Sequence, residues 1–136
     1  MPTISTPQNG AQALRFFVPG IPKPQGSMKV FNGHVVHENA PALKAWRETV
    51  AWTAKAAGAK VWDTPISVEV NFHLPRGKTV KRKYPTVPPD CDKLLRAIFD
   101  ALTGICYTDD ARIIKVAATK TYDTTPGASI AISQIM

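Results

Sequence analysis

The acidic residues of this chain are concentrated in one region, although the chain as a whole is basic, with a net charge of +7. Five of its ten acidic residues fall between positions 90 and 110, and they are Asp90, Asp92, Asp100, Asp109 and Asp110. A turn after Gly104 is predicted to bring Asp109 and Asp110 back near the preceding elements, so that three or four carboxylates share one spot. Carboxylates gathered at one place repel one another, so they need a nearby positive charge. Hard oxygen ligands with room for water favour Mg²⁺ or Mn²⁺.

The first three of these acids lie in PPDCDKLLRAIFDALTG, which is predicted to form a helix from about 90 to 103 that ends at Gly104. One face of this helix is apolar and is made of Leu94, Leu95, Ile98 and Leu102. On the other side Asp92, Arg96 and Asp100 follow one another at a spacing of four residues. Asp92 and Asp100 are about 12 Å apart along the axis and cannot hold the same ion. Asp100 is therefore predicted to support Arg96 or a neighbouring loop.

A purely structural interpretation of the same acids is open at this level. Asp90 is well placed to cap the helix, and Asp92 would complement the helix dipole in the first turn. Asp92, Arg96 and Asp100 would then form a surface charge ladder. The count of acids in one region favours the metal site instead.

A basic loop precedes the acidic helix. The segment RGKTVKRKYPTVPP carries five cations, namely Arg76, Lys78, Lys81, Arg82 and Lys83. A metal beside such a loop indicates phosphate chemistry, in which the ion activates water and stabilises the leaving oxygen. Arg96 would hold the scissile phosphate, and the loop would follow a nucleic-acid backbone unless it is only a solvated charge run. Tyr84 would either stack on an unpaired base or pack beside Pro85.

Zinc is disfavoured by the pattern of soft ligands. The three histidines are His34, His37 and His73, and no pair with metal-binding spacing lies near the acids. His34 and His37 are predicted to be loop residues that contact phosphate. Cys91 and Cys106 form neither a metal motif nor a disulfide framework, which is typical of a reducing cytoplasm.

The elements that must position these residues follow from periodicity and turn signals. They are a strand at 14–20, a turn-rich loop with a small hairpin at FNGHVV, a helix at 41–57, a strand in PISVEVNFHLP, the acidic helix, and strands at 111–123 and 127–133. The order β-α-β-α-β-β predicts a small, single α+β domain with a mixed sheet of about four strands and two main helices. Residues 1–13 are predicted to be a flexible tail. No leader and no membrane-spanning stretch is recognised, so a cytoplasmic location is expected.

PPDCDKLLRAIFDALTG, followed by DDARI, resembles the RusA family of Holliday junction resolvases, which is common in phages and prophages. The family pattern is Pro-Asp-x-Asp, a helix ending in Asp-Ala-Leu, and then Asp-Asp-Ala. The segment from VPGIPKPQGSMKVF to WRETV is also similar to the N-terminal half of phage members. The resemblance covers about residues 14–123 and assigns a RusA-like domain to 14–136. It implies a homodimer that cuts four-way DNA junctions with Mg²⁺ or Mn²⁺, in a bacterium or a phage-infected host cell.

The resemblance also implies roles for particular residues. The essential carboxylates fall on Asp90, Asp92 and Asp110, and a catalytic basic residue falls on Arg96, where some members have Lys. Asp109 is left with an assisting role. The KPQGS turn lacks the Arg-rich form of other members. Lys23 in this turn and Lys29 just after it are assigned as DNA contacts.

Two other functions stay open. One is a nuclease of the same chemistry that acts on flaps or replication forks. The other is a non-catalytic DNA-binding recombination protein whose acids serve only architecture. A glycosyltransferase with an Asp-x-Asp motif is disfavoured by the short chain and the basic loop.

For the homodimer, the 41–57 helix carries Trp46 on its apolar stripe and Trp52 about 240° further round. Trp52 would face a partner chain or cover a second part of the core.

Overall fold

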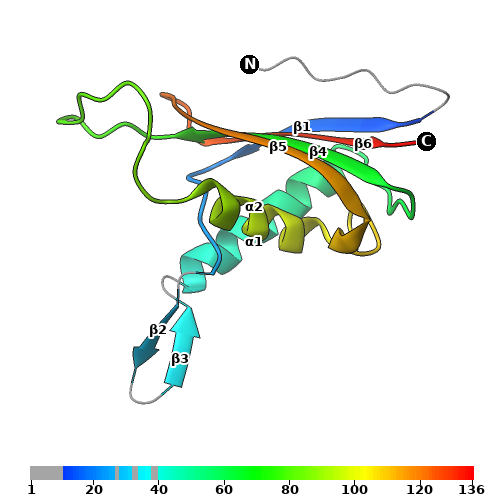
Figure 1. Cartoon of the computed structure of the whole chain (residues 1–136), viewed down its shortest axis with the longest axis horizontal. Helices are drawn as coiled ribbons and strands as arrows, with labels where there is room; N and C mark the ends of the chain where they lie inside the picture. Colours follow the sequence, from blue (N-terminus) through cyan, green and yellow to red (C-terminus); the bar gives the residue numbers. More distant parts are fainter. Residues whose placement is uncertain (1–10, 27, 32–33, 38–39) are drawn as a thin grey trace.

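Two helices cover one face of a four-stranded mixed sheet (Figure 1). The computed structural model describes residues 11–136 apart from 27, 32–33 and 38–39. The sheet has the order β1-β6-β4-β5, with β1 (Ala13–Pro19), β4 (Ile66–Leu74), β5 (Ile113–Tyr122) and β6 (Gly127–Gln134). The helices are α1 (Ala40–Ala56) and α2 (Cys91–Leu102). The predicted α+β class and the β-α-β-α-β-β order are confirmed, with a further hairpin after β1.

Helix α1 forms where periodicity predicted it. Its buried side chains are Leu43, Trp46, Val50 and Ala54, which recur at helical spacing on the side that faces the core. Gly58 follows the helix with a φ of +94°, a left-handed conformation that suits glycine. Trp52 lies on the outer side and is 72% exposed, so the interpretation that it covers a second part of the core is wrong.

Strand β4 lies between β5 and β6 and is buried on both faces toward its end. Its core face is made of the predicted residues Ile66, Val68, Val70 and Phe72. On the other face Asn71 and His73 are also buried, so β4 is more than the half-buried strand that its alternation predicted. His73 Nε2 lies 2.9 Å from the hydroxyl of Ser129 on β6, which satisfies this buried ring nitrogen.

The connection through α2 explains why the sheet is mixed. Strand β5 runs parallel to β4, because the chain crosses over through α2 before it returns. Strand β6 then runs antiparallel to both β4 and β1 and lies between them. Helix α2 therefore packs over the sheet with its apolar face inward; the buried residues are Leu94, Ala97, Ile98, Ala101 and Leu102. Leu95, which was predicted for the same face, is only partly buried.

Strands β2 (Met28–Phe31) and β3 (His34–His37) pair with each other in a separate two-stranded sheet, which confirms the predicted hairpin. His34 and His37 are the first and last residues of β3, so the prediction that they are loop residues is wrong. Their side chains and that of Lys29 lie outside the described residues, as does most of the predicted tail. None of the helices in the described ranges is long and apolar enough to cross a membrane.

Candidate active site

The segment that leads into α2 is fixed to the sheet by one lysine. Lys120 on β5 donates hydrogen bonds from its ammonium to the carbonyl oxygens of Val87, at 3.0 Å, and Pro89, at 2.9 Å. Its neighbour in the register is Phe72 of β4, so Lys120 extends from the helix-covered face of the sheet. These two bonds hold the residues immediately before Asp90.

Asp90 occupies the N-cap position of α2 but does not cap it. Its backbone is extended, and its carboxylate makes no hydrogen bond to a helix amide. The side chain is 57% exposed, and the Lys93 ammonium lies 3.9 Å from the Asp90 carboxylate. The interpretation of Asp90 as a capping residue is therefore wrong, and its carboxylate is free to bind a ligand.

The expected charge ladder along α2 is also not formed. Within the described part of the chain, no ion pair of 4.0 Å or less joins Arg96 to Asp92 or Asp100. Asp100 instead accepts a hydrogen bond from the side-chain amide of Gln25. This contact confirms the prediction that Asp100 supports a neighbouring loop.

That neighbouring loop, residues 21–26, runs along α2 and will be called the strap. The backbone amide of Gln25 donates to the carbonyl oxygen of Lys93 at 2.9 Å. Gly26 has a φ of +108°, and a methyl group on its α carbon would lie 2.9 Å from a guanidinium nitrogen of Arg96. The strap therefore packs directly against the Arg96 guanidinium, which would have to shift to make room for a larger side chain at this position.

After α2 the chain turns back and presents two adjacent carboxylates. Asp109 accepts a hydrogen bond of 2.9 Å from the backbone amide of Ala111 and so caps the short 3₁₀ turn at Asp110–Arg112. This hydrogen bond is the largest cause that lowers the pKa of Asp109. Desolvation is the largest cause that raises the pKa of Asp110. The hydrogen bond and the charge of Asp109 raise it further, followed by the charge of Asp100. Asp109 is thus engaged structurally, whereas Asp110 carries a charge that a cation would stabilise.

The turn that carries these two acids is anchored in the core. Tyr107 is fully buried, and its hydroxyl donates to the carbonyl oxygen of Phe99 at 2.8 Å. Burial also raises the pKa of the adjacent Cys106 thiol to about 12, so this thiol is protonated at neutral pH. Arg112 pairs with Asp63 at 2.8 Å. The loop from α2 to β5 is therefore held at several points.

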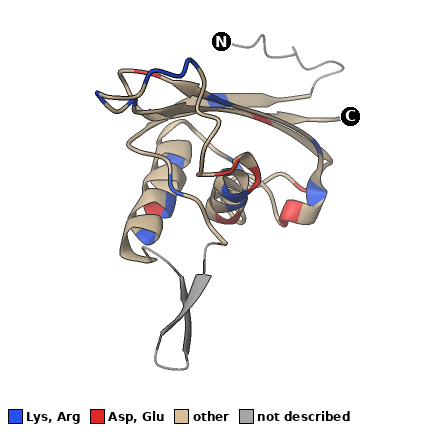
Figure 2. Ribbon diagram, turned by 60° about the vertical axis from the view of Figure 1, so that its left-hand side comes forward, with Lys and Arg blue, Asp and Glu red and all other residues tan. Residues whose placement is uncertain are grey.

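The acids follow α2 from its first residues to the turn beyond it (Figure 2). Asp90 and Asp92 are at the beginning of the helix, while the acids that shift the pKa of Asp110 are Asp109 and Asp100. Among the residues that the structure describes, no three acidic, histidine or cysteine side chains converge as a metal-binding group. The hard carboxylate oxygens fit Mg²⁺ that keeps several waters and takes a substrate phosphate, which is the usual way this ion binds. They do not form a closed three-carboxylate cage.

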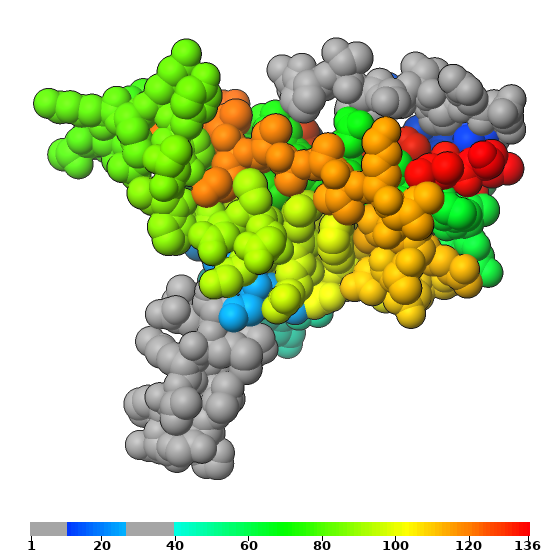
Figure 3. Space-filling model, viewed as in Figure 1, coloured from blue at the N-terminus to red at the C-terminus, as the bar shows by residue number. Residues whose placement is uncertain are grey.

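The basic loop between β4 and α2 is organised around Tyr122 of β5. The guanidinium carbons of Arg76 and Arg82 lie 5.7 and 5.9 Å from the centre of its ring. Arg82 also donates to the Tyr122 hydroxyl at 2.8 Å. In the space-filling view this loop (green) projects past the end of the sheet (Figure 3). Two of the five predicted cations are therefore held in place by an aromatic side chain.

Tyr84 in the same loop is 57% exposed, and the Lys83 ammonium lies 5.3 Å from the centre of its ring. The interpretation of Tyr84 as a packed side chain is thus wrong. Of the other predicted DNA contacts, Lys78 and Lys81 are exposed on the loop and Lys23 is partly buried in the strap. The described cations lie on either side of the beginning of α2.

Three residues at this site were not singled out from the sequence: Gln25, Lys120 and Tyr122. Lys120 had a recognisable signal, because the alternation of its strand places it on the helix-covered face of the sheet together with Ala118. A lysine on such a face usually has a specific partner. Gln25 had no such signal, since its partner is 75 residues away in sequence.

Fold and site together define a basic α+β domain with free carboxylates beside a cationic surface. The sequence model of the family described as endodeoxyribonuclease RusA matches residues 19–133, which is most of the chain. The chain therefore belongs to the RusA endodeoxyribonuclease family. It is also similar to a protein of Bacillus subtilis (strain 168) named "Uncharacterized protein YqaN", with 27% identity over 139 residues. That alignment covers 90% of this chain and 96% of the relative.

Proposed function

We propose that this endodeoxyribonuclease resolves four-way DNA junctions in a reaction that depends on Mg²⁺ or Mn²⁺. The observation that carries the proposal is the uncapped, exposed Asp90 at the start of α2, one residue from the exposed Asp92. A helix N-cap aspartate normally gains stability from a capping hydrogen bond. Here that bond is absent, so the carboxylate is available to a ligand.

The family resemblance makes Asp90, Asp92 and Asp110 the candidate metal ligands. Asp90 and Asp92 would share one ion at the start of α2, whereas Asp110, beyond the other end of the helix, would hold a cation apart from them. When bound, the metal supplies an activated water and charge stabilisation at the leaving oxygen. Desolvation raises the pKa of Asp110 most, and the hydrogen bond and like charges of its acidic neighbours raise it further, so a bound cation would stabilise its charged form. Arg96, held against Gly26, would place a guanidinium on the phosphate and offset the charge that develops there.

The cations on both sides of α2 would orient the DNA. Arg76 and Arg82 are fixed on Tyr122 and lose little side-chain freedom when they bind phosphate. Lys78, Lys81 and Lys83 extend the same loop, and Lys23 lies across from it on the strap. These contacts are sequence-independent and would select backbone geometry rather than bases.

A homodimer completes the proposal, because a four-way junction offers two equivalent strands related by a two-fold axis. An isologous dimer places two identical sites about such an axis. Trp52 supports this arrangement, since it is 72% exposed and has the Lys55 ammonium 5.6 Å from its ring centre. Wild-type chains mixed with Asp92→Asn chains should form heterodimers that nick one strand and rarely complete resolution. Paired cuts by a protein that sediments as a monomer would contradict the dimer.

The function is tested with a labelled four-way junction, incubated with and without Mg²⁺ or Mn²⁺. Paired cuts near the branch point only when the metal is present are expected. A parallel panel of flaps, forks and duplexes tests selectivity, because preferential cutting of flaps or forks would assign the other substrate class. Tight junction binding with no cutting under any metal would identify a non-catalytic DNA-binding protein.

A further inference from the structure

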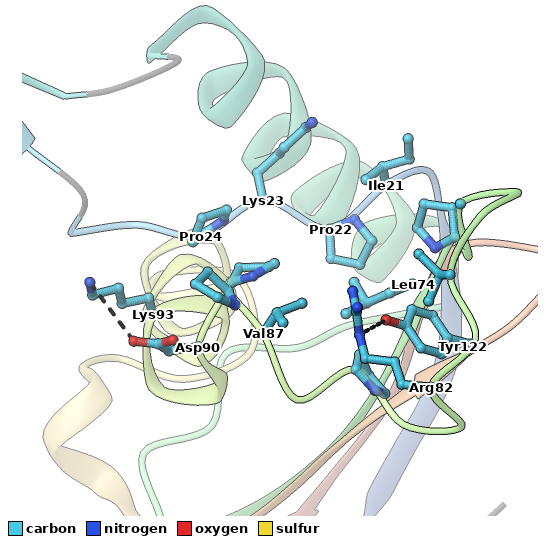
Figure 4. A pocket seen from close by; sticks show the side chains of 16 residues that line it. Ile21, Pro22, Lys23, Pro24, Leu74, Arg82, Val87, Asp90, Lys93 and Tyr122 are labelled. Atoms are coloured by element: carbon cyan, nitrogen blue, oxygen red, sulfur yellow. Dashed lines mark hydrogen bonds and ion pairs between the residues drawn. The ribbon is translucent and has the colours of Figure 1, made fainter.

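A cavity of about 540 Å³ opens beside the start of α2, between the strap and the basic loop (Figure 4). The strap contributes Pro22 and Pro24, the end of β4 contributes Leu74, and the loop before α2 contributes Val87. Cavities of this size are typical of sites for small molecules or single residues of a polymer. Asp90, a candidate metal ligand, lies on its rim, so the cavity adjoins the candidate active site.

The walls of the cavity are unusually rich in proline. Of the 16 lining residues, six are prolines: Pro22, Pro24, Pro75, Pro85, Pro88 and Pro89. Proline rings present flat apolar surfaces, and proline has no backbone N–H to donate. With Leu74, Val80 and Val87 they form an apolar lining. Such walls accept a flat group with apolar faces and hold it by stacking rather than by hydrogen bonds from the backbone.

The rim of the cavity is cationic. Lys23, Arg82 and Lys93 stand on it against the single acid Asp90. Arg82 is oriented by its 2.8 Å hydrogen bond to the Tyr122 hydroxyl, and Tyr122 itself lines the cavity. The occupant should therefore combine a flat, apolar-faced body with an anionic group outside. A nucleotide has this chemistry, whereas an uncharged apolar peptide would offer no anionic group to the cations of the rim.

We infer that the cavity binds one unstacked nucleotide of the DNA, next to the phosphate that is cut. This inference rests on the proposed function, because branched DNA supplies such a nucleotide most readily. Bases at a branch point have lost a stacking neighbour, and extrusion costs least for a base that is already poorly stacked or unpaired. The base would stack among the proline rings, while its phosphates meet Arg82 at the rim.

The location gives the cavity a role in choosing the cleavage position. Lys120 fixes Val87 and Pro89, and these residues join the cavity wall directly to Asp90. A nucleotide seated there is therefore held at a set distance from the candidate metal ligands. The seated nucleotide would then set which phosphate reaches the candidate metal ligands.

The test uses a four-way junction with 2-aminopurine at the branch point, whose fluorescence rises when the base leaves the stack. Ca²⁺ replaces Mg²⁺ during the binding measurement to prevent cutting. Val87→Trp fills the cavity without adding charge. Val61→Trp is the matched control, because Val61 is also exposed (52%, against 39% for Val87) and does not line the cavity. Thermal unfolding checks that both variants fold.

With wild type and Val61→Trp we expect the fluorescence to rise severalfold on binding. With Val87→Trp the junction should still bind, but the rise should be lost and cleavage should fall at least about tenfold. Ile21→Trp fills the cavity from the strap and should behave in the same way. Equal fluorescence changes in wild type and both cavity-filling variants would overturn the inference and leave the nuclease function standing. An absence of cutting by wild type, with the fluorescence rise retained, would contradict the proposed function alone.

Discussion

Lys120 donates a 2.9 Å hydrogen bond to the carbonyl oxygen of Pro89, the residue immediately before Asp90. Lys120→Met keeps the aliphatic stem but leaves this carbonyl and that of Val87 without their donor. We expect the free energy of unfolding to fall by about 1.5–3 kcal/mol, the usual contribution of a hydrogen bond to a charged group. Single-turnover cleavage should slow about tenfold, because Asp90 is no longer held in place.

Lys115→Met is the control for this change. Lys115 lies on the same strand, but at a position of the opposite face, and it is exposed. It should unfold and cleave like wild type. If both variants showed the same reduction in activity, the positioning role of Lys120 would be refuted.

Substitution of the candidate metal ligands should slow cleavage without weakening the binding of the junction. Asp90→Asn, Asp92→Asn and Asp110→Asn should each slow cleavage about a hundredfold or more, because charge stabilisation worth several kcal/mol is removed. Junction affinity should be unchanged or higher, since a repulsive charge is removed. Asp100→Asn is the control, because it keeps an oxygen acceptor for Gln25. Asp100→Asn should affect the cleavage rate much less than the other three substitutions. Cutting by Asp92→Asn at nearly the wild-type rate would refute the metal-site assignment.

The basic loop should act through ion pairs with DNA phosphates. Replacing Lys81, Arg82 and Lys83 with Gln should weaken binding equally for all sequences. The slope of log K against log salt should become shallower by about 0.9 for each phosphate that is no longer neutralised. A control that replaces the exposed Lys44, Lys55 and Lys60 with Gln removes the same charge elsewhere. Similar slopes in the two triple variants would show that the loop does not touch the DNA backbone.

The raised pKa of Asp110 predicts a dependence of stability on pH. A carboxyl whose pKa is higher in the folded than in the unfolded protein binds protons more tightly when folded. Stability therefore decreases as the pH rises from the ordinary pKa of 3.8 through the raised folded pKa. Asp110→Asn should melt at a higher temperature than wild type at pH 7 and at the same temperature below pH 3.8. Melting curves that differ equally at both pH values would contradict this.

Gly26 should matter because of Arg96 and not because of its backbone alone. Gly26→Ala places a methyl group 2.9 Å from the guanidinium, whereas Gly58→Ala meets nothing within 4 Å. Both glycines have positive φ values, so each substitution should cost about 1–3 kcal/mol of stability. Only Gly26→Ala should also slow cleavage, which single-turnover rates would detect. Equal rates in the two variants would mean that the position of Arg96 is not critical.

Local patterns predicted most of the fold. The alternation at Ile66–Leu74 and the helical spacing in α1 and α2 each follow from one element and the face that it buries. The site was predicted less completely, because its contacts join distant segments. Gln25 meets Asp100 and Arg82 meets Tyr122 across 75 and 40 residues of chain. No local period encodes such pairs.

The expected convergence of three carboxylates shows the same limit. The sequence predicted that the turn after Gly104 brings Asp109 and Asp110 back near the preceding elements, so that three or four carboxylates share one spot. Instead β5 begins beside the start of β4, where Ile113 is the register partner of Ile66. The chain must cross the length of α2 first, about 18 Å for 12 residues. Asp110 is therefore influenced by Asp100 near the end of the helix, and not by Asp90.

The place of β6 between β1 and β4 has a consequence for the synthesis of the protein. Strand β1 is made early but has its sheet partner only in β6, from Ala13 opposite Ser133 to Pro19 opposite Gly127. The strap continues directly from β1, so its contacts with Asp100 and Arg96 depend on a strand that is translated much later. A ribosome-bound chain that stops before β6 therefore lacks the sheet partner that places β1, and with it the strap, beside α2.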